Sequence, residues 1–542
     1  MEKKNFVTPL LGFVSTALLA RTIKLRQSRH ATGRSCVQTG AGTQADIPES
    51  LSESYSLIPR EVEEHRSCYI SKSCSVSYAN SGSLHIRNGR KSRLFDVFGN
   101  SYLDTRNNVA HCGHNHPEIV RAVSYQMSQI NTNTRYLHPN ASLLAKKLVD
   151  LFSPSPLEVV FFVNSGSEAN DLALRLARAF KVHTSKEKDA TTCREPHVIA
   201  IDAAYHGHTM TTLNISPYKY NQGDEFTKYP DNVKIVPCPD TYRGKHSIDQ
   251  SKASNNHHAS ERSSEEDAAR AYAAYVEKAC DEIKSQGKIL GAFIMEGGMS
   301  VGGVILPPKS YLRRCIKAVR DAGGVYIADE VQTGFGRLGK CMWAYQYSFA
   351  DENNDTELTP DIVTVGKPFG NGLPLAAVVT TSKIASAFKS LGVEYFNTFA
   401  GNPVSCSAGL AMLHILSTEK LQQNALQVGN YLKESFRDMQ QRREIIGDIR
   451  GSGLFLGLEL VKDRKTKTPA MEETSFICSV LKEKYLILTS VDGPGDNVIV
   501  IKPPMCFSKE DAIYFVRSFE RVVVEDLPLA KDRLDEIGKT PT

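Results

Sequence analysis

Two polar residues follow short apolar runs in the middle of the chain, and their side chains could take part in one reaction. Asp329 comes directly after the apolar run 325–328, and Lys367 comes soon after a second run at 362–365. Both runs have the composition of buried strands, whose ends face a ligand crevice in α/β proteins. A carboxylate that keeps a pyridine nitrogen protonated and a lysine that bonds to the cofactor aldehyde are what pyridoxal phosphate requires. Taken singly, Asp329 could cap a turn and Lys367 could lie on the surface.

The sequence around these two residues resembles the class III (omega-type) aminotransferase family. The block 329–337 reads DEVQTGFGR and the block 366–374 reads GKPFGNGLP. The resemblance implies the cofactor pyridoxal 5'-phosphate, and catalytic roles for the aspartate and the lysine. It also implies that Gln332 hydrogen-bonds the hydroxyl group of the cofactor ring, whereas we expect Glu330 to serve the structure.

A phosphate site is predicted where another apolar run meets a helical pattern. The sequence NSGSEAN at 164–170 follows the run 159–163 and begins that pattern. Free backbone amides at a helix start bind phosphate well, although Ser167 is also an ordinary N-cap residue. Within the family pattern, Gly166 and Ser167 are the phosphate ligands.

Two further cofactor contacts follow from the resemblance. Tyr205 follows the strand-like run 197–201 and matches the aromatic residue that stacks on the pyridine ring, although a tyrosine of the core is the alternative. Thr398, in the sequence NTFAGNP at 397–403, matches the threonine that reaches the phosphate of the neighbouring subunit. The resemblance therefore implies a homodimer, or a dimer of dimers, with shared active sites.

The predicted substrate residues depart from the family pattern. Glu296 matches a glutamate near the substrate pocket, which is often paired with an arginine that binds a substrate carboxylate. In many members that arginine stands three residues before a Pro-Pro pair, and Val500 occupies this position here. Valine cannot bind a carboxylate, but Lys502 lies on the same face of the predicted strand and could substitute in part.

Longer blocks resemble a subgroup, the ethanolamine-phosphate and 5-phosphohydroxylysine phospho-lyases, which are similar to mitochondrial alanine–glyoxylate aminotransferase. These blocks are 107–114, 131–138, 239–244 and 502–507. The resemblance implies an enzyme that acts on a primary amine and eliminates phosphate and ammonia from O-phosphoethanolamine or 5-phosphohydroxylysine. The alternative is transfer of an amino group to a keto acid, and a remote alternative is a non-catalytic scaffold with this fold.

Three arginines bear on the substrate. Arg135 and Arg243 are candidate ligands for a substrate phosphate, and each could instead form a structural salt bridge. Arg106 stands where the subgroup resemblance suggests an apolar residue, so it could alter the pocket.

The elements that must position these residues alternate between strands and helices. Runs such as 159–163, 197–201 and 292–295 are followed by amphipathic stretches, which predicts an α/β fold with a mostly parallel sheet. The resemblance implies fold type I of the pyridoxal phosphate enzymes, with a large cofactor domain and a smaller α+β domain from both chain ends. The expected parts are a targeting or disordered segment 1–56, small-domain segments 57–109 and 394–526, the large domain 110–393, and a tail 527–542. Solvent loops are expected at 184–196, 245–267 and 351–358.

The composition is that of a globular protein large enough for a substantial core. Of the 542 residues, 41% are hydrophobic and 23% are charged, which argues against a fibrous or disordered class. Part of the net charge of +5 arises within residues 1–45, so it gives no support to nucleic-acid binding. The twelve cysteines lack metal-type spacings and are expected to be reduced thiols, and we expect no metal site.

The amino-terminal segment favours mitochondrial targeting. The apolar run 6–20 contains Pro9 and is short for a membrane span, so no stable span is expected. Basic residues follow this run with no acid before Asp46, a composition similar to transit peptides. The alternatives are a short signal anchor, or a disordered tail on a cytoplasmic protein.

Overall fold

The computed structural model describes residues 47–79, 82–184, 195–221, 228–248, 257–349 and 358–530. Within them, one compact unit comprises 47–88 and 95–100, and the other comprises 89–94 and 101–530. The predicted targeting segment lies outside the described residues up to residue 46, as do most of the expected loops 184–196 and 351–358.

The smaller unit holds two short helices, α2 (Glu49–Ser56) and α3 (Pro59–Tyr69). We placed residues 49–56 in the targeting or disordered segment, and they form α2. Helix α3 begins with proline, which is compatible with the first helical position, and the Glu61 side chain accepts a hydrogen bond from the backbone N–H of Ile58. Strands β1 (Ile86–Arg90) and β2 (Arg93–Asp96) carry residues of both units.

The larger unit is built on a seven-stranded sheet with the strand order β4-β10-β9-β8-β7-β5-β6. Its strands are β4 (Leu157–Val163), β5 (His197–Ile201), β6 (Val233–Val236), β7 (Leu290–Glu296), β8 (Val325–Asp329), β9 (Ile362–Val365) and β10 (Ala376–Thr381). The pairs from β6 through β5, β7 and β8 to β9 are parallel, and β10 runs antiparallel to both of its neighbours. The predicted mostly parallel sheet is confirmed.

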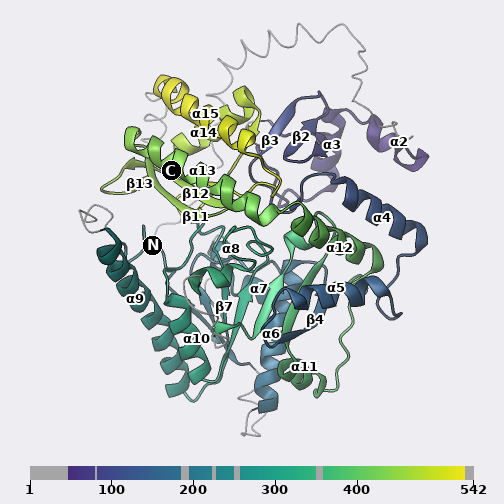
Figure 1. Cartoon of the computed structure of the whole chain (residues 1–542), viewed down its shortest axis with the longest axis vertical. Helices are drawn as coiled ribbons and strands as arrows, with labels where there is room; N and C mark the ends of the chain where they lie inside the picture. Colours follow the sequence, from purple (N-terminus) through teal and green to yellow (C-terminus); the bar gives the residue numbers. More distant parts are fainter. Residues whose placement is uncertain are drawn as a thin grey trace. The chain divides into compact units, whose positions relative to one another are not determined.

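Helices cover both faces of this sheet (Figure 1). They are α4 (Pro117–Gln129), α5 (Pro139–Asp150), α6 (Gly166–Thr184), α7 (Met210–Leu213), α8 (Pro217–Tyr220), α9 (His257–Ser285), α10 (Tyr311–Asp321), α11 (Ser382–Lys389) and α12 (Pro403–Thr418), with 3-10 turns η4 (Ala344–Phe349) and η6 (Lys367–Gly370). Alternate residues of a strand belong to two different apolar cores. Phe293 belongs to the core that includes residues of α9 and α10, whereas Ala292 and Ile294 belong to the core that includes residues of α6. This alternation follows from the two-residue period of a strand.

The loop predicted over 245–267 is wrong in its second half, because α9 begins at His257. Ala268 and Ala269 are buried in this helix, and Glu266 forms an ion pair with Arg314 of α10 at 2.6 Å. Ala268 and Ala269 begin the buried face of the helix, and the large apolar residues Tyr272, Val276 and Ile283 follow only beyond residue 267. The polar composition of residues 257–267 therefore gave no hydrophobic pattern from which the start of the helix could be predicted.

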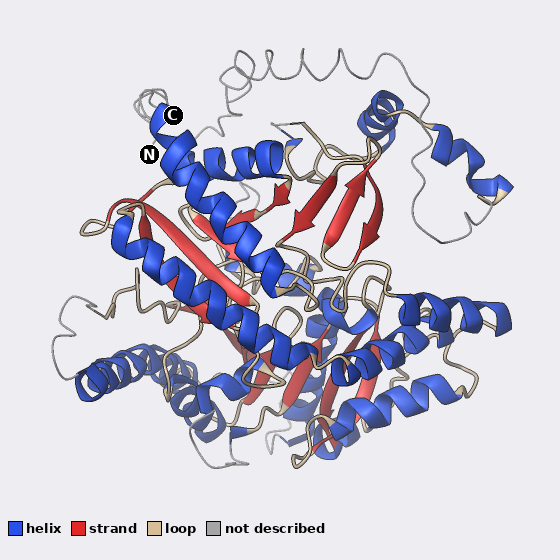
Figure 2. Cartoon of the chain, turned by 45° about the horizontal axis from the view of Figure 1, so that its top comes forward, coloured by secondary structure: helices blue, strands red, loops and turns tan. Residues whose placement is uncertain are grey.

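A second, antiparallel sheet follows the large sheet in the chain, with the order β11-β12-β16-β15 and β13 paired to β12 (Figure 2). Its strands are β11 (Ile446–Ser452), β12 (Phe455–Asp463), β13 (Thr468–Pro469), β15 (Ser490–Asp492) and β16 (Val498–Ile501). The helical segments of this region are α13 (Leu421–Arg442), α14 (Met471–Tyr485), α15 (Lys509–Arg521) and the π-helix η7 (Val522–Asp526). Strand β3 (Ser101–Asp104) pairs in parallel with β14 (Ile487–Leu488), so segments from both parts of the chain meet here. Among the described helices, none is both long and apolar enough to cross a bilayer.

Candidate active site

A cavity of about 380 Å³ lies at the carboxyl ends of strands β4, β5, β8 and β9. Six residues predicted from the sequence line it: Gly166, Ser167, Tyr205, Asp329, Gln332 and Lys367. They come from segments far apart in the chain, and the parallel strands bring them to one edge of the sheet.

Asp329 is the last residue of β8, and its carboxylate is buried and held on both oxygens. Its Oδ2 accepts a hydrogen bond from Asn170 Nδ2 at 2.7 Å and lies 2.8 Å from His206 Nδ1. Its Oδ1 accepts from the backbone N–H of Val331 at 3.0 Å, and Thr364 fixes Asn170 by donating to the Asn170 Oδ1 at 2.7 Å. These contacts fix the carboxylate in place and orient it.

Asn170 and His206 line the cavity but were not predicted as site residues. His206 directly follows Tyr205 in the sequence, and Asn170 lies one helical turn after Ser167, so each stood beside a predicted residue. The helical period was the available signal for Asn170, because residues three apart share one helix face.

Lys367 begins the turn η6, two residues after β9 ends. Burial lowers the pKa of its ammonium, while the carboxylates of Asp329 and Glu296 oppose this effect. A lysine with a lowered pKa carries a larger fraction of neutral amine, which is the form that acts as a nucleophile or a base.

The start of helix α6 and a nearby loop form a cradle that fits a phosphate group. Gly166 is the first residue of the helix, and the backbone N–H of His208 donates to Ser167 Oγ at 3.2 Å. At Gly207, where φ is +140°, an added Cβ would lie 2.5 Å from Ser167 Oγ. Only glycine permits this close approach. The backbone N–H of Glu168 donates to Ser165 Oγ at 3.2 Å, and the amides of Gly166 and Ser167 at the helix start suit an anion.

Gln332 is oriented by Asn108, another residue that the sequence analysis missed. The Asn108 Nδ2 donates to the Gln332 Oε1 at 2.9 Å, and both side chains are buried. Because this bond uses the carbonyl of Gln332, its amide N–H groups remain as donors for an acceptor in the cavity.

Glu296, at the end of β7, pairs in register with Asp329 on β8. Its carboxylate accepts hydrogen bonds from the backbone N–H groups of Tyr205 at 3.0 Å and Ser300 at 3.4 Å. Burial raises the pKa of Glu296 to about 7; the charge on His206 opposes this shift and the charge on Asp329 adds to it. Glu296 therefore holds the backbone of the cavity residue Tyr205.

Glu330 points away from the cavity into the protein, in agreement with the structural role expected for it. It is fully buried, and its two oxygens accept from the Tyr345 backbone N–H at 2.8 Å and from the Thr333 hydroxyl at 3.0 Å. Burial raises the pKa of Glu330 to about 7 in spite of these hydrogen bonds.

The substitution Glu330→Gln should therefore stabilise the protein at alkaline pH and have little effect near pH 5. Glutamine can keep both contacts, since its carbonyl accepts from Tyr345 and its amide donates to Thr333. In the folded protein the pKa of Glu330 is about 7, above its ordinary value of 4.5. Between these two pH values the folded state binds more protons than the unfolded state, so the stability of the wild type falls as the pH rises from 4.5 to 7. Above pH 7 the difference approaches about 3 kcal/mol. Urea unfolding of both proteins at the two pH values measures it, and a pH-independent difference would contradict this account.

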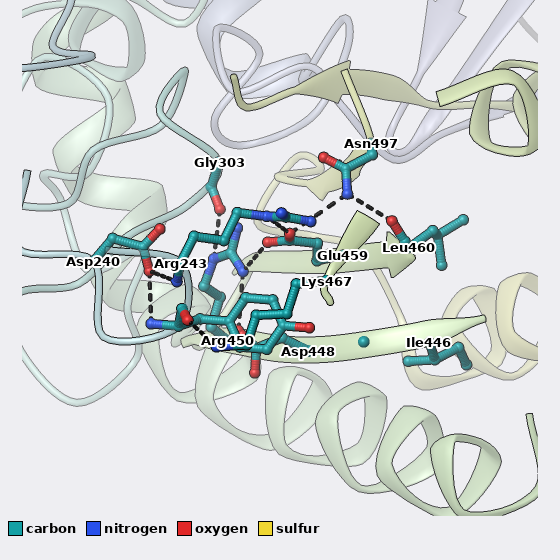
Figure 3. A network of polar contacts seen from close by, with 12 residues as sticks. Asp240, Arg243, Gly303, Ile446, Asp448, Arg450, Glu459, Leu460, Lys467 and Asn497 are labelled. Carbon is teal, nitrogen blue, oxygen red and sulfur yellow. Dashed lines mark hydrogen bonds and ion pairs between the residues drawn. The ribbon is translucent and has the colours of Figure 1, made fainter. Parts of the chain in front are cut away.

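Arg243 lies in an ion-pair network (Figure 3). It is absent from the residues that line the cavity. Its guanidinium contacts the buried Glu459 of β12, which also pairs with Arg450 of β11 at 2.5 Å. Arg450 in turn pairs with Asp448 at 2.9 Å. The structure thus shows the salt bridge that was the alternative for Arg243.

The remaining predicted residues also lie apart from the cavity lining. Arg135 is exposed, stands over the ring of Phe396 at 4.3 Å and lies 4.0 Å from Glu394. Thr398 is exposed on the single chain. Val500 is fully buried in an apolar cluster of the second sheet, so it offers no polar group to a substrate.

The residues around the cavity fit pyridoxal phosphate. The anchored acid Asp329 matches a protonated ring nitrogen, Lys367 has a lowered pKa, and Gln332 keeps free donors. The glycine cradle at the start of α6 matches the phosphate. Fold and site together therefore define a pyridoxal phosphate enzyme.

The chain belongs to the class III aminotransferase family, whose sequence profile matches residues 76–523. It is 45% identical over 470 residues to alanine–glyoxylate aminotransferase 2-like of Drosophila melanogaster, covering 87% of this chain and 88% of that one. It is 38% identical over 463 residues to ethanolamine-phosphate phospho-lyase homolog 1 of Caenorhabditis elegans, covering 85% of this chain and 93% of that one. It is 38% identical over 450 residues to a mitochondrial alanine–glyoxylate aminotransferase 2 homolog of Arabidopsis thaliana, covering 81% of this chain and 82% of that one.

A solved structure shares the fold. It is a phospholyase from Arthrobacter in complex with phosphoethanolamine, with a TM-score of 0.74 and 32% sequence identity, covering 86% of this chain and 99% of that one. The predictions of fold type I, of a pyridoxal-phosphate-dependent enzyme and of its family are thereby confirmed.

Proposed function

We propose that this enzyme is a phospho-lyase that eliminates phosphate and ammonia from O-phosphoethanolamine or 5-phosphohydroxylysine. The observation that carries the proposal is Val500, which is fully buried among apolar side chains where many family members have a carboxylate-binding arginine. The similarity to a phospho-lyase homolog and to a phosphoethanolamine-bound phospholyase supports it. The names of other relatives support the second candidate, a transaminase of the alanine–glyoxylate type.

In this proposal Lys367 is the catalytic nucleophile and base. Its amine is the group that would bond to the aldehyde of bound pyridoxal phosphate, where the substrate amine would then take its place. Bound pyridoxal phosphate supplies an electron sink for the carbon that bears the substrate nitrogen. The released lysine removes the proton from that carbon, and the lowered pKa of Lys367 favours the neutral form that this step needs.

We propose that the other cavity residues hold the cofactor during this step. Asp329, fixed by Asn170 and His206, keeps the ring nitrogen protonated, and Gln332 donates to the ring hydroxyl. The ring of Tyr205 would contact the pyridine ring, and the amides and hydroxyl at Gly166 and Ser167 would bind the phosphate.

The leaving group decides the outcome after proton removal. When the neighbouring carbon carries phosphate, its C–O bond breaks, the electron pair leaves with the phosphate, and water then converts the remaining carbon skeleton to an aldehyde and ammonia. Without a leaving group, Lys367 would return the proton at a different atom, and the amino group would be transferred to a keto acid. The same residues can therefore perform either reaction, and the substrate selects between them.

The purified protein should release phosphate and ammonia from O-phosphoethanolamine or 5-phosphohydroxylysine. The comparison is with alanine plus glyoxylate, for which glycine and pyruvate are measured under the same conditions. A phosphoamine rate that exceeds the transamination rate supports the phospho-lyase. If glycine and pyruvate form readily while no phosphate appears from either phosphoamine, the transaminase is correct.

We also propose a homodimer in which Thr398 reaches the cofactor phosphate of the neighbouring subunit. Thr398 is exposed on the single chain, and so are the large apolar side chains of Tyr136, Leu137 and Phe399, which are 71%, 102% and 71% exposed. Exposed apolar side chains of this size are typical of a surface that a partner covers.

The partition into a large domain at 110–393 and a small domain from both ends of the chain remains part of this proposal.

We propose a mitochondrial location. The basic segment before Asp46 motivates it, and related aminotransferases of Arabidopsis thaliana and Homo sapiens are named mitochondrial.

A further inference from the structure

We infer that Lys502 and Arg106 form an anion subsite for the phosphate group of the substrate. The subsite rests on the proposed function and deepens it, because it assigns the phosphate of the substrate to two named residues. Of the two arginines first considered for this phosphate, Arg135 is exposed and Arg243 is paired with Glu459. Lys502 and Arg106 are not among the residues that line the cavity either, but their neighbours contact residues that do.

The backbone brings these two residues together. Lys502 directly follows the last residue of β16, and its backbone N–H donates to the carbonyl of Thr105 at 2.9 Å. Arg106 is the next residue after Thr105, and its own N–H is held by Asp104 Oδ1 at 3.1 Å. The end of β16 and the segment after β3 therefore run side by side at this point.

The Lys502 side chain is held inside the protein. Only 12% of it is exposed, and its Nζ donates to the Ser300 hydroxyl at 2.8 Å and lies 3.7 Å from Asp492 Oδ2. Val500, two residues earlier on β16, enters the apolar cluster of the second sheet. The sequence thus removes a polar group at position 500 and places an ordered ammonium at position 502.

Two short series of contacts connect Lys502 and Arg106 to residues that line the cavity. On one side, Ser300 donates its N–H to Glu296, which also accepts from the backbone of the cavity residue Tyr205. On the other side, the segment that holds Arg106 continues to Asn108, which orients the cavity residue Gln332. The cavity residue Val109 follows directly.

The local charge balance favours a bound anion. Burial lowers the pKa of Lys502 to about 8; Asp492 opposes this shift, and the positive charges of Lys367 and Arg106 add to it. Burial raises the pKa of Asp492, although Lys502 and Arg106 both act to lower it. Lys502 and Arg106 both act on the carboxylate of Asp492, whereas Lys367 already faces the carboxylates of Asp329 and Glu296. A second negative charge between Lys502 and Arg106 would be stabilised there.

A phosphate suits this position better than a carboxylate. A phosphate monoester carries close to two negative charges near neutral pH and offers three oxygen acceptors, which two separate cationic groups can share. The Lys367 amine marks the place of the substrate nitrogen. A substrate that reaches from there to Lys502 has its amine at one end and its anion at the other.

The test compares ligand binding by Lys502→Met with binding by the wild-type holoenzyme. Three ligands are compared. The first is 3-aminopropylphosphonate, which replaces the ester oxygen of O-phosphoethanolamine by a methylene and cannot lose phosphate. The others are 4-aminobutyrate, with a carboxylate at its far end, and propylamine, which has no anionic group. The change in cofactor absorbance as each amine displaces Lys367 gives its affinity. We expect Lys502→Met to weaken phosphonate binding by about 30-fold and to leave propylamine binding unchanged.

Two variants control for indirect effects. Lys502→Arg keeps the charge and should recover most of the phosphonate affinity. Lys433 is a matched control, because it is also a largely buried lysine whose pKa burial lowers to about 8, and its Nζ donates to the Gly451 carbonyl at 2.9 Å. Lys433→Met should bind all three ligands like the wild type. Arg106→Leu should weaken the phosphonate selectively, as Lys502→Met does.

Equal losses for phosphonate and propylamine in Lys502→Met would overturn the subsite, as would unchanged phosphonate binding. Wild-type affinity for 4-aminobutyrate equal to that for the phosphonate would overturn the assignment to phosphate. Failure of the proposed function gives a different result: the phosphonate binds in a manner that depends on Lys502, yet O-phosphoethanolamine releases no phosphate.

Discussion

Lys367→Ala should abolish turnover while the protein stays folded and retains its oligomeric state. The residue begins η6 at the edge of the central sheet, and it lines the same cavity as Asp329. Alanine removes both the amine that bonds to the cofactor and the base that moves the substrate proton, so two functions disappear together. Removing a buried amine with a lowered pKa also removes a desolvation cost, so we expect no loss of thermal stability.

Borohydride reduction of the wild-type holoenzyme, followed by peptide mass spectrometry, locates the cofactor. We expect it on Lys367, and the alanine variant should carry no reduced adduct. Added methylamine should restore part of the lost activity, because it can supply the missing base. Reduction onto another lysine, or wild-type turnover by the variant, would remove Lys367 from its proposed role.

Asp329→Asn should retain the cofactor but lose at least about 100-fold in turnover, since a preorganised charge at the reacting group is removed. The amide cannot hold the ring nitrogen protonated. In the wild type, the amide of Asn170 donates to the Asp329 Oδ2 at 2.7 Å. The substituted asparagine must therefore present either its own carbonyl or its own amide group to Asn170. The phosphate cradle at Gly166 and Ser167 is unchanged, so cofactor binding should persist.

Glu330→Gln is the matched control for this substitution. Glu330 follows Asp329 directly in the sequence, and both carboxylates are buried. The hydrogen-bond partners of Glu330 include Ala344, Tyr345 and Thr333, and none of these three lines the cavity. The control should keep wild-type turnover. Equal activity of the two variants in a steady-state assay would remove Asp329 from the catalytic role.

The residues predicted best from the sequence are those at the ends of strands and helices. Asp329 and Lys367 each follow an apolar run, and parallel strands bring such ends to one edge of the sheet. Gly166 and Ser167 stand where a strand gives way to a helix, so their place in the fold also followed from local pattern. For these residues, the local pattern predicted their position at the ends of strands and helices, and the family resemblance predicted their roles.

The supporting contacts could not be predicted in the same way, because they join residues that are distant in the chain. Asn108 orients Gln332 across 224 positions, and Arg243 pairs with Glu459 across 216. A polar residue carries no local sign of such a partner. Arg243 therefore had two open interpretations until the fold placed it against β12.

The number of phosphate ions released per active site, with O-phosphoethanolamine as substrate and no keto acid, tests the proposed reaction most directly. Elimination leaves the cofactor in its aldehyde form, so the wild-type enzyme should release many phosphates per site, with equal amounts of ammonia and aldehyde. Lys367→Ala should release none. If the amino group instead stays on the cofactor after a single turnover, no phosphate appears, and added glyoxylate yields glycine, the phospho-lyase proposal is wrong.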